Sequence, residues 1–424
     1  MRPSYDVAVV GAGPAGSVTA LVLARAGARV ALLDKATFPR DKACGDLIGP
    51  RGVRLLADLD VDVPAVGRGS DMLVEGPGGG RIRLPAYPGV SYADHGVVVP
   101  RVTFDACLRD AAIAAGARPV TGRVTALSAP DDHGQVRLAL AGEDDLSAGT
   151  VVGADGALSV VGRLSGLVDE RHARWGFAVR AYVRADVPMP LIALLDREPG
   201  SIFPGYGWLF PATPGYANVG IGVGTGTTRQ VLPLRPALDG FIAHLERSGD
   251  VGVSPAGRLL GGWLKMGIAG TTPGRGPVLL VGDAAGLVNP LQGEGIAPAL
   301  TSGVYAAQAI LDGPSSAAAG YRDRLRATFQ RHAATGTMLQ TTLLHHPRLT
   351  SMTARALTAP PLRRVVGGPW SLLWNDLVEG ATPRPAATTA RLLAAASARL
   401  TARGASARAV DHSLRDVPIS SRCP

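Results

Sequence analysis

The sequence is poor in cysteine, in charged residues and in long apolar runs. Three cysteines, Cys44, Cys107 and Cys423, are too few for a disulfide framework in a chain of 424 residues. No stretch of about 20 residues is continuously apolar, so we expect no membrane-spanning helix. Residues 1–10 contain no long apolar core before a cleavage site, so we also expect no signal peptide. These absences predict a cytoplasmic protein.

The chain is basic, but the distribution of its charge does not favour nucleic-acid binding. The net charge is +9, and the basic residues are scattered through Ala-rich and Gly-rich stretches. Seven arginines and two aspartates in residues 381–424 give this tail a charge of about +5. A basic tail can contact anionic lipid or an acidic partner, but a solvated extension is the favoured interpretation. We expect no nucleic acid as a partner.

Length and composition predict a folded protein with more than one domain. Apolar residues make up 46% of the chain, and 424 residues exceed the usual size of a single core. The simplest organisation is a mixed α/β fold, in which a nucleotide-binding domain is interrupted by an antiparallel-sheet domain and followed by a helical region. The expected ranges are 1–165 and 271–330 for the nucleotide-binding domain, 166–270 for the sheet domain, 331–380 for the helical region and 381–424 for the basic tail.

Hydrophobic patterns predict the main helices and strands. Short apolar runs indicate buried parallel strands, and alternating segments between residues 174 and 224 indicate an antiparallel sheet. We expect strands at 6–10, 30–33, 151–153, 176–184, 217–223 and 277–281. We expect helices at 14–26, 101–115 and 295–311. Beyond residue 320 the chain is predicted to be helical to about residue 380, with interruptions at Pro347, Pro360 and Pro369.

A glycine-rich turn follows the first predicted strand and matches the pattern G-x-G-x-x-G. Gly11 permits a tight turn, Gly13 lets the backbone approach a diphosphate, and Gly16 lets helix and strand pack closely. The helix N-terminus offers N–H groups and a positive dipole end to that anion. Asp34, at the end of the second strand, is placed to accept hydrogen bonds from a ribose. The candidate dinucleotide-binding residues of this unit are Gly11, Gly13, Ala15, Gly16, Asp34 and Lys35.

Two later segments also begin where a short apolar strand ends. One is Gly-Ala-Asp-Gly at residues 153–156, and the other is Gly-Asp-Ala-Ala-Gly at residues 282–286, followed by Gly-Glu-Gly-Ile at residues 293–296. An aspartate at such a position can simply cap a helix, and for either segment alone that interpretation is favoured. Together with the glycine-rich turn, the two segments instead predict that three distant parts of the chain surround one dinucleotide.

These three segments together resemble the class A flavoprotein monooxygenase and geranylgeranyl reductase superfamily. The resemblance implies bound FAD, with Asp283 at the ribityl chain and the turn at 293–296 leading into a helix that faces the flavin pyrimidine. Such a helix N-terminus stabilises negative charge on a reduced flavin. Asp155 matches a motif linked there to handling of FAD and reduced nicotinamide. Arg101 matches an FAD-contacting arginine, with a surface salt bridge at a helix start as its alternative. The implied cofactor-binding residues are Arg101, Asp155, Gly282, Asp283, Gly293, Gly295 and Ile296.

Three further motifs are similar to the geranylgeranyl reductase branch of this superfamily. They are Phe-Pro-Arg-Asp-Lys-Ala-Cys-Gly at 38–45, Tyr-Gly-Trp-Leu-Phe-Pro at 206–211 and Pro-Leu-Gln-Gly-Glu-Gly at 290–295. The resemblance covers about residues 5–380 and implies a glutathione-reductase-type FAD domain with an inserted antiparallel sheet and a helical C-terminal region. The branch usually carries another small glycine soon after Cys-Gly, whereas here Asp46, Leu47 and Ile48 follow, and Leu47 adds bulk beside the flavin ring.

Aromatic residues alternate at Tyr206, Trp208 and Phe210, so they share one face if this segment is a strand. Such a face beside a flavin suits a flat or chain-like apolar substrate, although an ordinary buried sheet face is favoured on the residues alone. Cys44 is by default a small buried thiol, but the resemblance places it near the flavin ring. The candidate catalytic residues are Cys44, Tyr206 and Trp208, and we name no metal ligand.

The resemblance implies an FAD-dependent oxidoreductase that takes electrons from NAD(P)H or another reductant. Its expected substrate is an apolar small molecule, prenylated or otherwise isoprenoid. The leading hypothesis is alkene reduction by hydride from the reduced flavin, with Tyr206 or water as the candidate proton donor. The alternative is an FAD-dependent monooxygenase, an epoxidase or hydroxylase of an isoprenoid or polyketide. A non-catalytic flavin-binding protein is a second alternative. The sequence leaves the oligomeric state open.

Residues 365–377 include Trp370, Trp374 and several leucines. This stretch can lie on a membrane or cap the substrate cavity, and an ordinary packed helix is the favoured interpretation. Because an apolar substrate partitions into lipid, shallow contact with a membrane is one of the hypotheses that the sequence raises.

Overall fold

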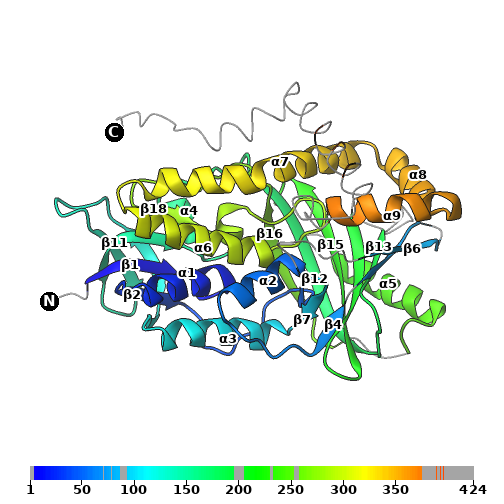
Figure 1. Ribbon diagram of the computed structural model, residues 1–424, viewed down its shortest axis with the longest axis horizontal. Coiled ribbons are helices and arrows are strands. Elements are labelled where there is room, and N and C mark those ends of the chain that lie inside the picture. The colour runs from blue at the N-terminus through cyan, green and yellow to red at the C-terminus, as the bar shows by residue number, and fades with distance from the viewer. Residues whose placement is uncertain are drawn as a thin grey trace.

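The computed structural model describes residues 4–374, apart from 70, 78, 86–92, 195–204, 230–232 and 253–256, together with the isolated positions 388, 392 and 395. The fold is mixed α/β, as predicted, and the described residues form three sheets. Figure 1 shows an elongated molecule, with the N-terminal strands at one end and the helices of residues 347–374 at the other. The predicted basic tail at 381–424 lies outside the described residues, except for those isolated positions.

The first sheet carries the nucleotide-binding motifs. Its strands are β1 (Ser4–Val10), β2 (Val30–Asp34), β8 (Arg118–Thr121), β9 (Arg123–Leu127), β10 (Val136–Ala141), β11 (Leu146–Gly153), β17 (Gly274–Arg275) and β18 (Val278–Leu280). Five of them run parallel in the order β18, β11, β1, β2 and β8. The carboxyl ends of parallel strands meet at one edge, so the three motif segments, which follow β1, β11 and β18, start side by side.

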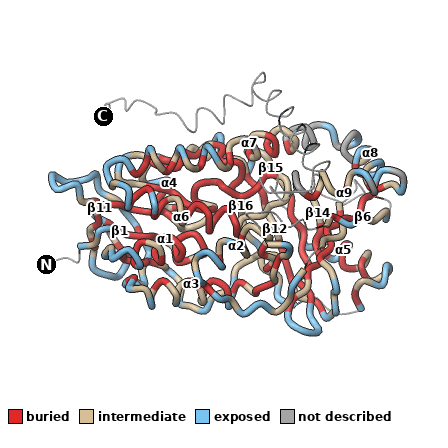
Figure 2. Tube along the Cα trace, in the orientation of Figure 1, coloured by how far each residue is buried: buried red, intermediate tan, exposed pale blue. Residues whose placement is uncertain are grey.

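Helices cover this sheet and explain why its strands are continuous apolar runs. The helices α1 (Pro14–Arg25), α3 (Arg101–Ala114) and α6 (Ile296–Asp312) pack together, and the short α4 (Val160–Leu164) follows β11. Val7 to Val10 and Val30 to Leu33 are all buried, as expected for strands that are covered on both faces. Figure 2 shows buried chain in these inner strands and in α1 and α6, as well as in the second sheet that is described next.

The second sheet has seven strands and forms the other half of the molecule. In spatial order they are β16 (Leu260–Met266), β12 (Arg174–Arg184), β15 (Tyr216–Gly226), β14 (Gly205–Pro211), β13 (Leu191–Leu194), β5 (Met72–Glu75) and β6 (Arg81–Leu84). All neighbours pair antiparallel except β13 and β5. The helix α5 (Leu234–Ser248) packs on β12 and β15 and buries Leu238, Phe241 and Leu245.

Two strands of this sheet come from a part of the chain that the sequence analysis placed in the nucleotide-binding domain. The strands β5 and β6 lie within the expected range 1–165 but pair with the sheet expected at 166–270. The sequence pattern did not reveal them because each has only four residues and glycine and proline surround them. The same region, expected only to be mixed, also contains α2 (Pro50–Asp58) and a small third sheet of β3 (Leu47–Ile48), β7 (Gly96–Val98) and β4 (Gly67–Gly69).

Three helices form the C-terminal region, α7 (Ala317–His345), α8 (Pro347–Thr358) and α9 (Pro360–Trp374). Pro347 and Pro360 open α8 and α9, but the predicted interruption at Pro369 is wrong because this residue lies inside α9. A proline inside a helix removes one backbone hydrogen bond, which neighbouring contacts can offset. Here α9 packs on β6, and the Ser371 hydroxyl donates a hydrogen bond of 2.7 Å to the Pro85 carbonyl.

Candidate functional site

The turn after β1 is built by two glycines that no other residue can replace without displacing backbone. Gly11 has a φ of +106°, and a Cβ added there would lie 2.3 Å from the Ala154 carbonyl oxygen. A Cβ on Gly16 would lie only 1.8 Å from the Gly11 carbonyl oxygen. The close approach of β1, β11 and α1 therefore depends on both residues, as the glycine motif predicts.

Gly13 differs from its two neighbours because it faces open space. The only atom within 4 Å of a Cβ added at Gly13 is Nη2 of Arg40, at 3.5 Å. Gly13 is also the N-cap of α1, whose first turn carries no acidic residue and no side-chain cap. A helix N-terminus and a guanidinium thus converge beside a residue without a side chain, and this arrangement fits an anionic diphosphate. Arg40 belongs to the 38–45 motif, but the sequence analysis did not single it out.

The carboxylate of Asp34 is fixed beside the same turn. It accepts hydrogen bonds from the backbone N–H groups of Ala12, at 2.8 Å, and Ala36, at 2.9 Å. Each carboxylate oxygen has a further lone pair that can accept from a ribose hydroxyl. Lys35 follows as an exposed residue, and its part in cofactor binding stays a prediction.

Asp155 lies next to Gly11, but its carboxylate serves the helix α4. One oxygen accepts from the backbone N–H groups of Val160, at 2.6 Å, and Val161, at 3.1 Å, and the other accepts from the Ser159 hydroxyl. These contacts are those of a helix cap, which was the alternative interpretation of this residue. A contact of Asp155 with FAD or reduced nicotinamide therefore stays a prediction without support from its observed hydrogen bonds.

The third segment packs directly against the first. It forms a short 3-10 helix, η1 (Gly282–Ala285), in which a Cβ on Gly282 would lie 3.0 Å from the Cβ of Ala15. Asp283 pairs with Lys42 at 3.3 Å across the cleft. One oxygen of the same carboxylate would lie 3.3 Å from a Cβ on Gly295, the N-cap of α6. Asp283 therefore stands between the 38–45 loop and the N-terminus of α6.

The turn that leads into α6 is held in place by its own side chains. Gly293 has a φ of +68°, a conformation that favours glycine, and the Tyr206 hydroxyl lies 3.0 Å from the position of its missing Cβ. The Glu294 carboxylate accepts a hydrogen bond of 2.7 Å from the backbone N–H of Ala297, and this bond caps the first turn of α6. Gly295 and Ile296 follow at the start of the helix, so its N-terminus faces the space beside Asp283.

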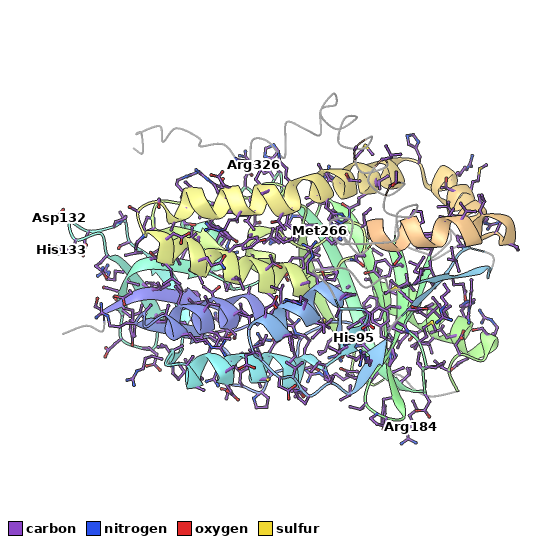
Figure 3. All side chains as sticks on the ribbon, viewed as in Figure 1. His95, Asp132, His133, Arg184, Met266 and Arg326 are labelled. Carbon is purple, nitrogen blue, oxygen red and sulfur yellow. The ribbon has the colours of Figure 1, made fainter. Side chains whose placement is uncertain are left out.

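A cavity of about 840 Å³ begins at this point and extends to the C-terminal helices. Strands of the second sheet form one wall of it, and Met266, labelled in Figure 3, is one of the residues of β16 that line it. Its volume is near the upper end of the usual range for small-molecule sites, and its walls are mainly apolar. Residues at the cofactor end are Pro14, Lys42, Arg101, Asp283, Gly295 and Ile296. Residues at the other end are Leu357, Val365, Pro369 and Trp370.

The middle of the cavity has an aromatic wall. Tyr206, Trp208 and Phe210 all line it from β14, as their alternation predicts, and the ring centroids of Trp208 and Phe210 are 6.3 Å apart. The Trp208 indole N–H donates a hydrogen bond of 3.0 Å to the side-chain oxygen of Asn218. A Cβ on Gly220 would lie 2.1 Å from the Trp208 ring. The absence of a side chain at Gly220 thus lets the indole lie against β15.

Cys44 and Arg101 meet at the cofactor end of this wall. Arg101 forms a bidentate ion pair with the fully buried Asp105, at 2.7 and 2.8 Å, and Arg40 contacts the same carboxylate at 2.9 Å. The alternative interpretation of Arg101 was a surface salt bridge, but the pair is buried and the arginine lines the cavity. Burial raises the pKa of the Cys44 thiol, and the Arg101 charge only partly opposes this effect, so the thiol stays protonated at neutral pH.

Asp46 is a functional candidate that the sequence analysis treated only as a departure from the family pattern. It is fully buried with a φ of +64°, and its carboxylate accepts hydrogen bonds from the Tyr182 hydroxyl and the Asn218 amide. Burial raises the pKa of Asp46, whereas the bonds from Tyr182 and Asn218 lower it. The Asn218 amide also donates to the Cys44 carbonyl at 2.8 Å. One buried network therefore fixes both the Cys44 loop and Trp208.

Half of the predicted site residues line the cavity, namely Cys44, Arg101, Tyr206, Trp208, Asp283, Gly293, Gly295 and Ile296. Gly13 and Asp34 lie at the N-terminus of α1. Arg40 lies beside Gly13 and forms an ion pair with Asp105. Asp105 also pairs with Arg101, which lines the cavity. Within the described ranges, no group of three or more His, Cys, Asp or Glu residues is placed to hold a metal ion. Nor does any helix there have the length and apolarity needed to cross a bilayer.

This site and the fold around it define an FAD-dependent oxidoreductase. A family model described as an FAD binding domain matches residues 4–192, which contain the turn after β1, the Cys44 loop and Asp155. The chain is 37% identical over 332 residues to the menaquinone reductase of Mycolicibacterium smegmatis, covering 74% of this chain and 78% of that protein. It is 31% identical over 340 residues to digeranylgeranylglycerophospholipid reductase 1 of Methanopyrus kandleri, covering 77% of this chain and 87% of that protein.

The chain belongs to the geranylgeranyl reductase family of FAD-dependent oxidoreductases. The crystal structure of a geranylgeranyl bacteriochlorophyll reductase-like protein from Thermoplasma acidophilum has the same fold, with a TM-score of 0.73 at 24% identity. It is matched over 92% of this chain and 96% of that one. The flavin-dependent brominase Bmp2 also shares the fold, with a TM-score of 0.68 at 18% identity over 95% and 100% of the two chains. These structural similarities concern the fold alone.

Proposed function

We propose that this protein reduces a carbon–carbon double bond in the prenyl chain of a lipophilic substrate, with an isoprenoid quinone such as menaquinone as the first substrate to test. The observation that carries the proposal is the long apolar cavity, which extends from Asp283 and the N-terminus of α6 past Trp208 to α9. A cavity of this shape fits a chain better than a compact polar molecule. We also propose that residues 1–165 and 271–330 form a glutathione-reductase-type FAD domain, from which β5 and β6 extend into the substrate sheet.

The named substrates of the relatives support the choice of a prenyl chain. One set of relatives is named for menaquinone and another for digeranylgeranylglycerophospholipid. The head groups of these two molecules differ, but both carry unsaturated isoprenoid chains. Both relatives are named reductases, so we propose that the isoprenoid chain that the two substrates share is the part that is reduced. The cavity agrees with this choice because its middle and far walls are built from Trp208, Phe210, Leu357 and Trp370.

The proposed chemistry gives distinct roles to the flavin and to the residues of the chain. FAD held at the turn after β1 and at Asp283 would supply the hydride when it is reduced, from electrons that NAD(P)H or another reductant would provide. An isolated alkene accepts hydride poorly, so the site must protonate it early or stabilise developing positive charge. The aromatic faces of Trp208 and Phe210 line the cavity where such charge can be stabilised.

Cys44 is a better proton-donor candidate than Tyr206. The Tyr206 hydroxyl donates its proton to the Gln292 carbonyl, and burial raises the pKa of Tyr206 well above its usual value. The Cys44 thiol lines the cavity in its neutral form, and Arg101 lies beside it to stabilise the thiolate that proton transfer leaves behind. We therefore assign Tyr206 to the positioning of the turn at Gly293 and propose Cys44 as the donor.

The test is a single turnover without oxygen. The FAD-loaded protein is reduced with dithionite and mixed with detergent-solubilised menaquinone that carries an unsaturated chain. Air is then admitted so that any quinol returns to quinone before mass analysis. We expect reoxidised flavin and a quinone that is heavier by two hydrogens, since reduction of the chain survives the reoxidation whereas reduction of the ring does not.

Two outcomes would contradict the proposal. A product that gains oxygen, and only when oxygen is present during turnover, would identify a monooxygenase instead. Flavin that no prenylated substrate reoxidises would remove the proposed substrate class. The variant Cys44→Ser tests the proton donor, with Cys107→Ser, which changes a half-buried thiol that does not line the cavity, as the matched control. We expect at least a tenfold loss of turnover for the first and no change for the second. Normal turnover in Cys44→Ser would assign the proton to water or another group.

A further inference from the structure

The cavity opens to solvent at the end of the molecule that is remote from the nucleotide cleft. Two of the described lining residues, Thr353 of α8 and Val365 of α9, are exposed, whereas every other described lining residue is buried or half-buried. Figure 1 shows α8 and α9 together at this end, on the side away from the N-terminal strands. The mouth of the cavity therefore lies between these two helices.

The surface around this mouth exposes large apolar side chains. Val365 is 73% exposed, Met352 of α8 is 68% exposed, and Leu362 of α9 is 43% exposed. Leu362 and Val365 are three residues apart, so they project from the same side of α9. Exposed apolar side chains on the two helices that line the mouth indicate a contact surface.

The charge of the same two helices has one sign. Residues 346–374 contain four arginines and neither aspartate nor glutamate. Arg348 and Arg355 are exposed, and their spacing from Met352, four residues before and three after, places all three on one side of α8. Two helices that carry exposed apolar side chains and arginines but no carboxylate complement an anionic bilayer, where apolar side chains enter the acyl region and arginines contact lipid phosphates.

The inner faces of the two helices are anchored, so the outer faces are free to make this contact without unfolding. Thr358 of α8 packs against Gly76, where an added Cβ would lie 2.1 Å from its hydroxyl oxygen. Gly367 of α9 approaches the Arg83 carbonyl oxygen of β6, with an added Cβ at 3.1 Å. Neither helix has the length and apolarity needed to cross a bilayer, so the contact is with the membrane surface.

We propose that the surface formed by Arg348, Met352, Arg355, Leu362 and Val365 docks on an anionic lipid bilayer and directs the mouth of the cavity into it. A substrate dissolved in the membrane then enters the cavity without crossing water. The entry of substrate rests on the proposed function, whereas the docking itself does not. The two are tested separately below.

The docking is tested by flotation of the FAD-loaded protein with vesicles. One set is phosphatidylcholine alone, and the other contains phosphatidylglycerol as well. We expect flotation with the anionic vesicles that weakens as salt is raised, since salt screens the arginines. The double variant Arg348→Glu/Arg355→Glu and the single variant Met352→Glu should each lower vesicle binding about tenfold or more. Arg123→Glu on β9 is the control for the arginine variant, and Leu311→Glu on α6 is the control for the methionine variant. Each changes an exposed arginine or an exposed apolar residue outside the proposed surface, and each should bind like the wild type.

The proposal fails if the α8 variants float like the wild type, if wild-type binding ignores phosphatidylglycerol, or if the wild type does not float. It also fails if light scattering shows a dimer that the α8 variants convert to monomer, because a second copy would then cover this surface. Turnover separates the two proposals. The α8 variants should lose activity on vesicle-embedded menaquinone and keep it on detergent-solubilised menaquinone. Wild type that binds vesicles but reduces no prenylated substrate would refute the proposed function and leave the docking intact.

Discussion

A fully buried lysine beside the cofactor segment gives the most quantitative prediction. Lys265 of β16 is 0% exposed, and its ammonium donates a hydrogen bond of 2.7 Å to the carbonyl of Ala284, which lies in η1 next to Asp283. Burial lowers the pKa of Lys265 from its ordinary value of 10.5 to about 8, although the carboxylates of Asp155, Asp283 and Glu170 act in the opposite direction. We propose the variant Lys265→Met, which keeps the length of the side chain and removes the charge.

The sign of the effect follows from proton binding. Between about pH 8 and 10.5 the unfolded chain keeps the proton on Lys265 while the folded protein releases it, so stability rises with pH in this window. The difference between the two pKa values corresponds to roughly 3 kcal/mol of unfolding free energy across the whole window. From neutral pH to roughly pH 9.5, the unfolding free energy of the wild type should rise by about 2 kcal/mol from this group. Lys265→Met loses this rise and, at every pH, also loses the hydrogen bond to Ala284.

The assay is urea unfolding of the wild type and the variant at a series of pH values from about 7 to 9.5. The unfolding free energy of the wild type minus that of Lys265→Met should increase by about 2 kcal/mol over this range, because the other titrating groups cancel in the difference. Lys42→Met is the matched control, since Lys42 is 39% exposed and its ion pair with Asp283 reaches solvent. If the difference in unfolding free energy stays flat or falls as pH rises, burial does not lower the pKa of Lys265.

Four further predictions concern the cofactor and the aromatic wall. Gly13→Glu should fold but lose FAD, seen as colourless purified protein, since it places negative charge where the diphosphate is expected; full FAD occupancy would contradict the site. Asp283→Ala should weaken FAD retention at least tenfold in equilibrium dialysis, and unchanged affinity would remove its proposed ribityl role. Gly220→Ala should displace the Trp208 indole and lower turnover at least tenfold while FAD stays bound. Trp208→Ala should likewise impair turnover more than FAD binding; loss of folding with full activity per folded molecule would show that Trp208 only packs the core.

The nucleotide-binding elements could be predicted from the sequence because their physics is local. The turn at Gly11 and Gly16 needs glycine for steric reasons within one strand–helix unit, and the strands around it are long enough to show an apolar run. The alternation of Tyr206, Trp208 and Phe210 identified the aromatic face for the same reason.

The rest depends on long-range pairing that no local pattern records. Two short strands, β5 and β6, join the second sheet only through their contact with β13. Asp46 and Lys265 become notable through burial, and their partners lie far away in the sequence, at Asn218 and Ala284. The observed hydrogen bonds of Asp155 go to the nearby α4, so the cofactor contact that its family position implies stays a prediction.

The two ends of the cavity come from different parts of the chain. Pro14, Arg101 and Asp283 surround one end, while α8 and α9 form the other after every cofactor-binding segment has been completed. Under the proposed function, the first set of residues determines which carbon reacts, and the last two helices surround the entrance through which the prenyl chain reaches it. A change confined to α8 and α9 would therefore alter the access of the substrate and leave the residues at the cofactor end as they are.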